Sequence, residues 1–464
     1  MTGVRSAGLQ LPPLRSVVEG ISWPALPATL GAALLAQLHQ LEESQWWSPD
    51  ELVQRQFGQL GQLVRHARRH SPFYRARLAA AGLSSLTAWS PESLARMPLL
   101  SRTELLLQAQ DIFTRQIPRE HGAAHEKKSS GSTGRPVVVR RTELNDLFNM
   151  SLTMRDHLWH RRDFHGTLAV VRPMVAVCDD PATAARNGWG PPVSLLFDSG
   201  PGYARPLTTD VALQAEWLTE RNPDYLLTYP TNLNALLDCF ERSGRVPSRL
   251  KELRTIGETL PATLRARCRE RLDAQIVDLF SSEEVGAIAL QCPESGLYHI
   301  QAESLLVEVL GEDGRACGPG QTGRVVITDL HNFATPLIRY DTCDYAEVGP
   351  PCACGRNLPT LVRILGRQRN MIVLPNGVRF WPLVGAYYFR EAAPVLQYQL
   401  VQHRLDDIEV RLVTERPLTT REEQELAAII HQALGHAFPL RFIYFEGELP
   451  GCSGKFEEFI SHVA

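Results

Sequence analysis

Apolar residues recur at helical spacing through the first quarter of the chain. Trp46 and Trp47 precede the run Ser48-Pro49-Asp50-Glu51, which signals the start of a helix. The apolar positions that follow at helical spacing are Leu52, Phe57, Leu60, Leu63 and Val64. Residues 1–110 are therefore predicted to form a helical segment that packs on a larger domain.

Short apolar stretches alternate with helical patterns between residues 165 and 290. In chain order they cover 168–177, 211–218, 225–228, 232–240, 255–257 and 276–280. Such alternation is typical of an α/β domain in which helices cover a layered sheet. A β-rich subdomain is expected next, because strand-like runs at 305–310, 323–328 and 346–348 are joined by turns such as Glu312-Asp313-Gly314.

The pattern changes again after Gly366. Strand-like runs at 371–374, 397–401, 408–413 and 442–445 accompany a helical pattern at 420–434, which predicts a short α+β unit. The predicted fold class is therefore α/β, with a large domain of layered sheets at 111–365 and a small C-terminal domain at 366–464. No internal repeat is evident.

Composition narrows the class of protein. The chain has 464 residues, 44% of them hydrophobic and 21% charged, which is typical of globular proteins. A net charge of −3 supplies no basic field for nucleic acid. The apolar run at 25–38 is too short to span a bilayer and lacks a basic leader, so we expect no signal peptide and a cytoplasmic enzyme without membrane partners, either monomeric or homodimeric.

Cysteine and lysine usage adds two observations. Nine cysteines in a chain of this length do not form a dense disulfide pattern, and Cys178, Cys239 and Cys268 are expected to be reduced core residues. The chain contains only four lysines, Lys127, Lys128, Lys251 and Lys455, against a large excess of arginine. The retention of Lys455 after a glycine suggests a need for an ammonium group at that position.

A run of small residues at 129–136 is the first feature with chemical meaning. Its sequence is Ser129-Ser130-Gly131-Ser132-Thr133-Gly134-Arg135-Pro136, followed by a β-branched run at 137–139. Glycines and hydroxyls let backbone N–H groups approach phosphate oxygens closely, so this loop can hold a triphosphate. It lacks the Gly-Lys-Ser/Thr ending of a Walker A loop, and in isolation such a run is more often an ordinary turn.

Five ordered motifs from residue 125 onward resemble the adenylate-forming superfamily, in particular its phenylacetate-CoA ligases and the related capsule-biosynthesis adenylating proteins. After the 129–134 loop come Gly257-Glu258-Thr259-Leu260 and the segment from Asp278 to Gly286. They are followed by Leu337-Ile338-Arg339-Tyr340-Asp341-Thr342-Cys343-Asp344, with Gly366-Arg367 beyond it, and by Ser453-Gly454-Lys455-Phe456. The resemblance implies a large domain, a small mobile domain, and ATP with Mg²⁺.

The resemblance also implies roles for single residues. Residues 129–134, Gly257, Glu258, Phe280 and Ser281 would bind the nucleotide, with Phe280 stacked on adenine. Glu284 would hold Mg²⁺, a cation that prefers oxygen ligands. Asp344 would accept hydrogen bonds from the ribose hydroxyls, with Arg367 after it at the hinge. Lys455 would stabilise the charge that builds up between the attacking carboxylate and the α-phosphate.

Two departures from the family pattern affect this prediction. Glu283 replaces the Ser or Thr that precedes the catalytic glutamate, which puts one phosphate contact in doubt. Gln368, Arg369 and Asn370 replace the usual acidic hinge residues, which puts in doubt the domain rotation that admits the thiol. A separate set, Cys292, His299, Cys352 and Cys354, could close a tetrahedral zinc site, or its members could be reduced bystanders.

The leading functional hypothesis is ATP-dependent activation of a carboxylic acid, aryl or arylalkyl by resemblance, followed by acyl transfer to coenzyme A. Transfer to an amine, a hydroxyl or a carrier-protein thiol is the second hypothesis, and a non-catalytic nucleotide-binding protein is the third. Core packing is an equal alternative for each candidate acid-pocket residue. These candidates are Trp189, Phe197, Tyr203, Tyr229 and Pro230.

Overall fold

The structure is a computed structural model that describes residues 11–128, 137–173, 176–367, 371–380, 382, 389, 392–446, 449 and 459–463. Within these ranges no helix combines the length and apolarity needed to cross a membrane.

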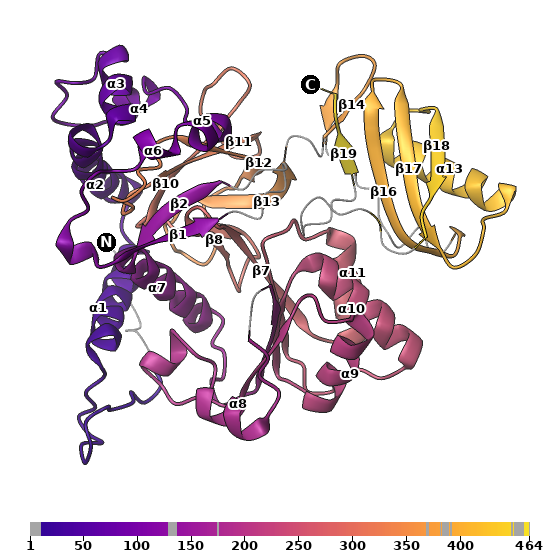
Figure 1. The fold of residues 1–464 in the computed structure, drawn as a ribbon, viewed down its shortest axis with the longest axis horizontal. Coiled ribbons are helices and arrows are strands. Elements are labelled where there is room, and N and C mark those ends of the chain that lie inside the picture. The colour runs from indigo at the N-terminus through magenta and orange to yellow at the C-terminus, as the bar shows by residue number, and fades with distance from the viewer. Residues whose placement is uncertain are drawn as a thin grey trace.

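One large sheet organises most of the chain (Figure 1). In the described residues its strand order is β10-β11-β12-β13-β9-β8-β7-β6-β5-β3-β4. Neighbouring strands are parallel from β4 to β7 and antiparallel from β7 to β10, so β7 is the strand where the two halves meet. The bounds are β3 (Leu168–Arg172), β4 (Gly202–Pro206), β5 (Tyr225–Thr228), β6 (Glu252–Ile256), β7 (Gln275–Ser282), β8 (Gly286–Gln291), β9 (Tyr298–Ile300), β10 (Leu305–Leu310), β11 (Thr322–Asp329), β12 (Tyr340–Val348) and β13 (Thr360–Arg367).

Helices cover both faces of the parallel half. Strand alternation sends Ala169 and Val171 to one face, into a core shared with α9 (Val211–Arg221), α10 (Pro230–Ser243) and α11 (Ala262–Leu272). Leu168 and Tyr225 point to the other face, into a core shared with α7 (Glu143–Trp159). The short elements nearby are α8 (Pro181–Asn187) and the 3-10 turn η2 (Val193–Leu195).

Most of the N-terminal helices pack on the antiparallel half of the sheet, whereas the first packs on α7 beside the parallel half. They are α1 (Thr29–Ser44), α2 (Pro49–His70), α3 (Pro72–Ala80), α4 (Pro91–Ala95), α5 (Arg102–Leu107) and α6 (Ala109–Ile112), with the 3-10 turn η1 (Arg119–His121) after them. The predicted helix start is confirmed, because Ser48 and Glu51 form a capping box at α2. Leu60, Leu63 and Val64 are buried in a core that also contains residues of β10 and β11.

A separate small sheet forms the C-terminal unit, drawn in yellow in Figure 1. Its described strand order is β18-β17-β16-β19, and α13 packs its apolar residues Leu426, Ile430 and Leu434 on the sheet. The bounds are β14 (Ile372–Val373), β15 (Arg379–Phe380), β16 (Val395–Arg404), β17 (Asp407–Thr414), α13 (Thr420–Leu434), β18 (Leu440–Tyr444) and β19 (Phe459–Ser461). The predicted α/β class with a large and a small unit is confirmed, whereas the predicted boundary near residue 366 stays a prediction.

Candidate active site

The turns after β6 and β7 bring several predicted residues to one edge of the sheet. Ile256 and Leu279 are Cα partners in parallel strands, so Gly257 after β6 and Phe280 in β7 lie at the same edge. Gly257 has a φ of +75°, and a Cβ added to it would lie 2.9 Å from Cε1 of Tyr229. Only glycine suits this turn, because the backbone has left-handed geometry and packs directly against the tyrosine ring.

Glu258 fastens this turn to the start of α10. Its carboxylate accepts hydrogen bonds from the backbone N–H of Thr231 at 2.9 Å and from the Thr231 hydroxyl at 2.8 Å. A carboxylate at a helix N-terminus is favoured by the unsatisfied N–H groups and the helix dipole. The side chain thus holds the turn in place, while Phe280, 8% exposed, is packed in the hydrophobic core beneath the sheet edge. The adenine contacts of both residues stay predictions.

Glu284 lies in the turn between β7 and β8 and is 8% exposed. Its Oε1 is 3.3 Å from Nη1 of Arg102, the first residue of α5. Backbone hydrogen bonds hold the segment just before Arg102. The N–H of Leu100 donates to the carbonyl of Arg339, and the N–H of Asp341 donates to the carbonyl of Leu100. The N-terminal helical segment therefore contributes a charged group to the site.

Tyr340 completes this group. Burial, together with the neighbouring Glu284 carboxylate, raises the pKa of this tyrosine, which stays protonated, and the charge of the nearby Arg102 opposes the rise. Sequence reasoning named Glu284 and missed Arg102. The only local signal at Arg102 is the capping box of Ser101 and Glu104, and that signal describes a helix start rather than a ligand.

Asp344 and Arg367 lie directly opposite each other in the antiparallel pair β12–β13, where they are Cα partners. The register shifts just beyond them, between Tyr345 and Ala346, and Cys343 has a φ of +62°. Such irregularity re-aims side chains at the end of a ladder. The sequence separates these residues widely, and the strand pairing brings their backbones together.

The predicted phosphate loop is bracketed by a hairpin. β1 (Ala124–Lys128) and β2 (Val138–Thr142) are antiparallel, and Lys128 is the Cα partner of Val138. Ser129, Ser130, Gly131, Ser132, Thr133 and Gly134 lie outside the described residues, as do Lys455 and the hinge residues Gln368, Arg369 and Asn370. Their predicted roles stay predictions.

The candidate acid-pocket residues divide into two groups. Trp189 and Phe197 are buried in the core beside α7, and Tyr203 is buried in the core on the opposite face. These three are packing residues in the described structure. Tyr229 and Pro230 lie at the end of β5 and the start of α10, beside the Gly257 turn.

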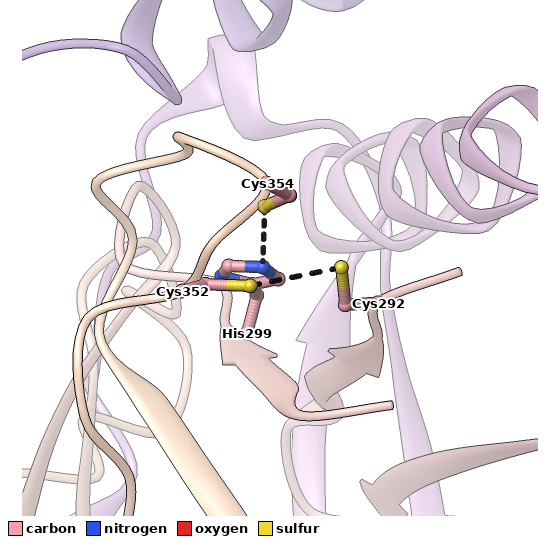
Figure 2. A group of neighbouring side chains, drawn as sticks. All are labelled: Cys292, His299, Cys352 and Cys354. Carbon is pink, nitrogen blue, oxygen red and sulfur yellow. Dashed lines mark hydrogen bonds between the residues drawn. The ribbon is translucent and has the colours of Figure 1, made fainter. Parts of the chain in front are cut away.

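Cys292, His299, Cys352 and Cys354 converge, as Figure 2 shows. Their candidate ligand atoms all lie within 4.8 Å of one another. Sγ of Cys292 is 3.8 Å from Sγ of Cys352, and Nε2 of His299 is 3.3 Å from Sγ of Cys354. Tetrahedral zinc with bonds of about 2.3 Å to sulfur requires about 3.8 Å between sulfurs, so the donor set matches such an ion.

The surroundings of this cluster orient the donors. Nδ1 of His299 is 3.3 Å from the carbonyl of Leu358, which leaves Nε2 facing the sulfurs. Burial opposes ionisation of the Cys292 thiol, but hydrogen bonds from His299 and Ser295 prevail and lower its pKa to about 5. Arg356, two residues after Cys354, lies over the Trp159 ring at 4.5 Å and contacts Gln45 at 3.0 Å. Arg356 thus attaches the 352–356 turn to the end of α7 and to the residue that follows α1.

Comparison with known proteins gives consistent results. No family model matches the chain. The phenylacetate-coenzyme A ligase of Thermus thermophilus is 28% identical over 390 residues, covering 79% of this chain and 82% of that protein. The enzyme of the same name from Escherichia coli is 25% identical over 409 residues, covering 83% and 87%. A 2-hydroxyisobutyryl-CoA ligase structure in complex with its acyl-AMP superposes with a TM-score of 0.71 at 19% identity, covering 90% and 93%.

The fold and the curated relatives agree on one class of protein, the adenylate-forming ligases, to which this chain is similar. Within that class it is similar to the phenylacetate-CoA ligase-like branch. The predicted superfamily and branch are confirmed.

Proposed function

We propose that this chain uses ATP to activate a carboxylic acid as its acyl-adenylate and then transfers the acyl group to coenzyme A. One observation carries the proposal. Arg102 pairs with Glu284, and Leu100, two residues before it, forms a β-bridge with Tyr340, which begins the strand that carries Asp344 opposite Arg367. Arg102 and strand β12 thereby connect Glu284, Asp344 and Arg367, the residues to which the family resemblance gives metal, ribose and hinge roles.

The chemistry proceeds in two displacements. A carboxylate oxygen of the acid attacks the α-phosphorus of ATP, and the bond to the bridging oxygen breaks to release pyrophosphate. The coenzyme A thiol then loses its proton and attacks the acyl carbon, and AMP leaves with the electron pair of the acyl–oxygen bond. Lys455 would act in the first step, because a mobile ammonium stabilises charge that develops only in the transition state.

Magnesium is the proposed metal of the reaction. The Glu284 carboxylate is the hard oxygen donor that this ion prefers, and it is held at the sheet edge by Arg102. When bound with ATP, the ion would neutralise phosphate charge. The remaining ligands would come from phosphate oxygens and water, because Mg²⁺ in nucleotide sites is commonly held by few protein carboxylates.

Relatives guide the choice of substrates. Phenylacetate-CoA ligases at 28% identity support coenzyme A as the acceptor and an arylalkyl acid as a starting point for assays.

We also propose that Cys292, His299, Cys352 and Cys354 bind a structural zinc ion. All four positions are taken by protein donors, so this ion would stabilise the fold and would have no open position for a reactant.

The decisive experiment is acid-dependent exchange of labelled pyrophosphate into ATP, followed by an assay for the coenzyme A thioester. Exchange with a panel of aryl, arylalkyl and aliphatic acids, together with thioester formation, is the expected result. Exchange without thioester, with hydroxylamine trapping of the adenylate, would replace the proposed acceptor by an amine or hydroxyl. ATP binding without exchange for any acid would contradict the enzyme proposal.

A further inference from the structure

Arg172 is the last residue of β3, and Tyr229 directly follows the neighbouring strand β5. Val170 of β3 and Leu227 of β5 are Cα partners, and Arg172 and Tyr229 each lie two residues further along. Because side chains alternate along a strand, Arg172 points to the same α7 face as Leu168, and the backbone of Tyr229 is still extended. Burial raises the pKa of the Tyr229 hydroxyl, and the nearby Arg172 guanidinium opposes that rise.

Arg172 differs from two other arginines of this region, Arg162 and Arg254, in its carboxylate partners. Arg162 lies 2.7 Å from both Asp156 and Glu252, and Arg254 lies 2.7 Å from Asp156. Arg172 is half-buried, and no carboxylate in the described part of the chain forms an ion pair with it. Its charge also repels that of the buried Arg254.

The nearest carboxylates do not compensate this charge. Glu258 is near enough to act on Tyr229, but Thr231 already donates hydrogen bonds to both of its oxygens. Glu283 also acts on Tyr229 only through its field, and its side chain is exposed to solvent. A half-buried guanidinium without a carboxylate partner, next to a tyrosine hydroxyl, is suited to bind an anionic group from outside the chain.

The Arg172–Tyr229 pair lies close to the site proposed for the substrate. The Tyr229 ring packs against Gly257, the residue that begins the turn assigned to the nucleotide, so the pair lies beside the reaction site rather than at a remote surface. The reacting carboxylate must face the α-phosphate, which leaves the rest of the acid to extend from there. Burial raises the pKa of Tyr229, so its hydroxyl stays protonated and can donate.

We infer that the acid activated by this enzyme carries a second carboxylate, which the Arg172 guanidinium binds with a second hydrogen bond from the Tyr229 hydroxyl. The inference rests on the proposed function, because it names the acid used at the same site. Arginine binds carboxylates through two parallel N–H donors, so it would select both the charge and the position of the second group.

The test compares matched pairs of acids in pyrophosphate exchange. Phenylacetate and 2-carboxyphenylacetate form one pair, and butyrate and glutarate form a second, aliphatic pair. The wild type should use at least one diacid about 10- to 100-fold more efficiently in kcat/KM than its monoacid partner, as expected for a hydrogen bond to a charged group. Arg172→Met should abolish this preference by impairing the diacid alone, and Arg172→Lys should restore part of it.

Arg205→Met is the control variant. Arg205 lies on β4, next to the Cα partner of Arg172, and it is already paired with Asp179 at 2.8 Å. The Arg205→Met variant should keep the wild-type preference for the diacid. Robust exchange with monoacids and no preference for diacids would overturn the inference while leaving the proposed function intact, as would equal losses for both acids in Arg172→Met with an unchanged melting temperature. Absence of exchange with every acid would overturn both.

Discussion

Arg102 and Glu284, which are 182 residues apart in the chain, form a largely buried ion pair with an N–O distance of 3.3 Å. Their side chains are only 14% and 10% exposed. The pair connects the N-terminal helices to the turn that holds the proposed magnesium ligand, so those helices contribute a charged group to the candidate active site as well as packing. Removing one partner of such a pair leaves the other as an uncompensated buried charge.

We expect Arg102→Met and Glu284→Gln each to lower pyrophosphate exchange by about 100-fold, the usual cost of losing one electrostatic contact to a reacting group. Because both substitutions remove the same ion pair, the double variant should have only slightly lower exchange activity than the less active single variant. Steady-state exchange across a magnesium titration checks this. Arg96→Met is the control, since Arg96 is exposed and its side chain hydrogen bonds to the Ala81 carbonyl, away from Glu284. Wild-type exchange in Arg102→Met would contradict the assigned role.

Lys455→Ala should abolish adenylation while leaving ATP binding nearly unchanged, because the ammonium acts on charge that exists only in the transition state. A loss of at least about 100-fold in exchange is expected. Lys251→Ala provides a control among the few lysines, since Lys251 is exposed and paired with Asp224 at 3.0 Å. A variant that still forms adenylate at the wild-type rate would remove Lys455 from the mechanism.

The four-residue Cys/His cluster should contain one zinc ion per chain in protein purified without chelators, measured by plasma mass spectrometry. Cys354→Ser should lose the metal and lower the melting temperature, because a structural ion contributes directly to folding. Cys317→Ser should keep it, as Cys317 lies outside the cluster. If the wild type is metal-free and equally stable with a chelator present, the four residues are reduced bystanders.

Acid should destabilise the fold through buried histidines. His331 stacks on Phe148 with ring centroids 3.9 Å apart, and burial, assisted by the nearby His121, lowers its pKa from 6.5 to about 4. Between these values the unfolded chain binds more protons than the folded one, so the free energy of unfolding falls as the pH falls from 6.5 to 4. His331 alone would contribute about 3 kcal/mol to that fall.

Urea unfolding at pH 7 and pH 4.5 measures this effect. His331→Gln should show a smaller loss of stability between the two pH values than the wild type. His39→Gln is the control, because His39 is exposed on α1 beside Glu43. An acid dependence that is identical in wild type and His331→Gln would show that this side chain is not responsible.

Local patterns in the sequence predicted much of the architecture. The helix at 420–434 coincides with α13, the strand at 305–310 coincides with β10, and the capping signal at Ser48 starts α2 as expected. These features depend on side-chain periodicity and hydrogen bonds between near neighbours, which a single chain segment already contains. The family motifs likewise pointed to Glu284 and Asp344, and donor chemistry pointed to the cysteines and His299.

Contacts between distant segments could not be predicted in the same way. Arg102 is identified as part of the site only when Leu100 pairs beside Tyr340, and Arg172 becomes notable only when β3 and β5 align it with Tyr229. For Trp189 and Phe197 the sequence left a pocket role and core packing both open, and both residues lie in the core. The sequence by itself therefore determined the elements and the family chemistry, while tertiary structure decided which charges meet, because pairing and burial depend on segments that no local pattern connects.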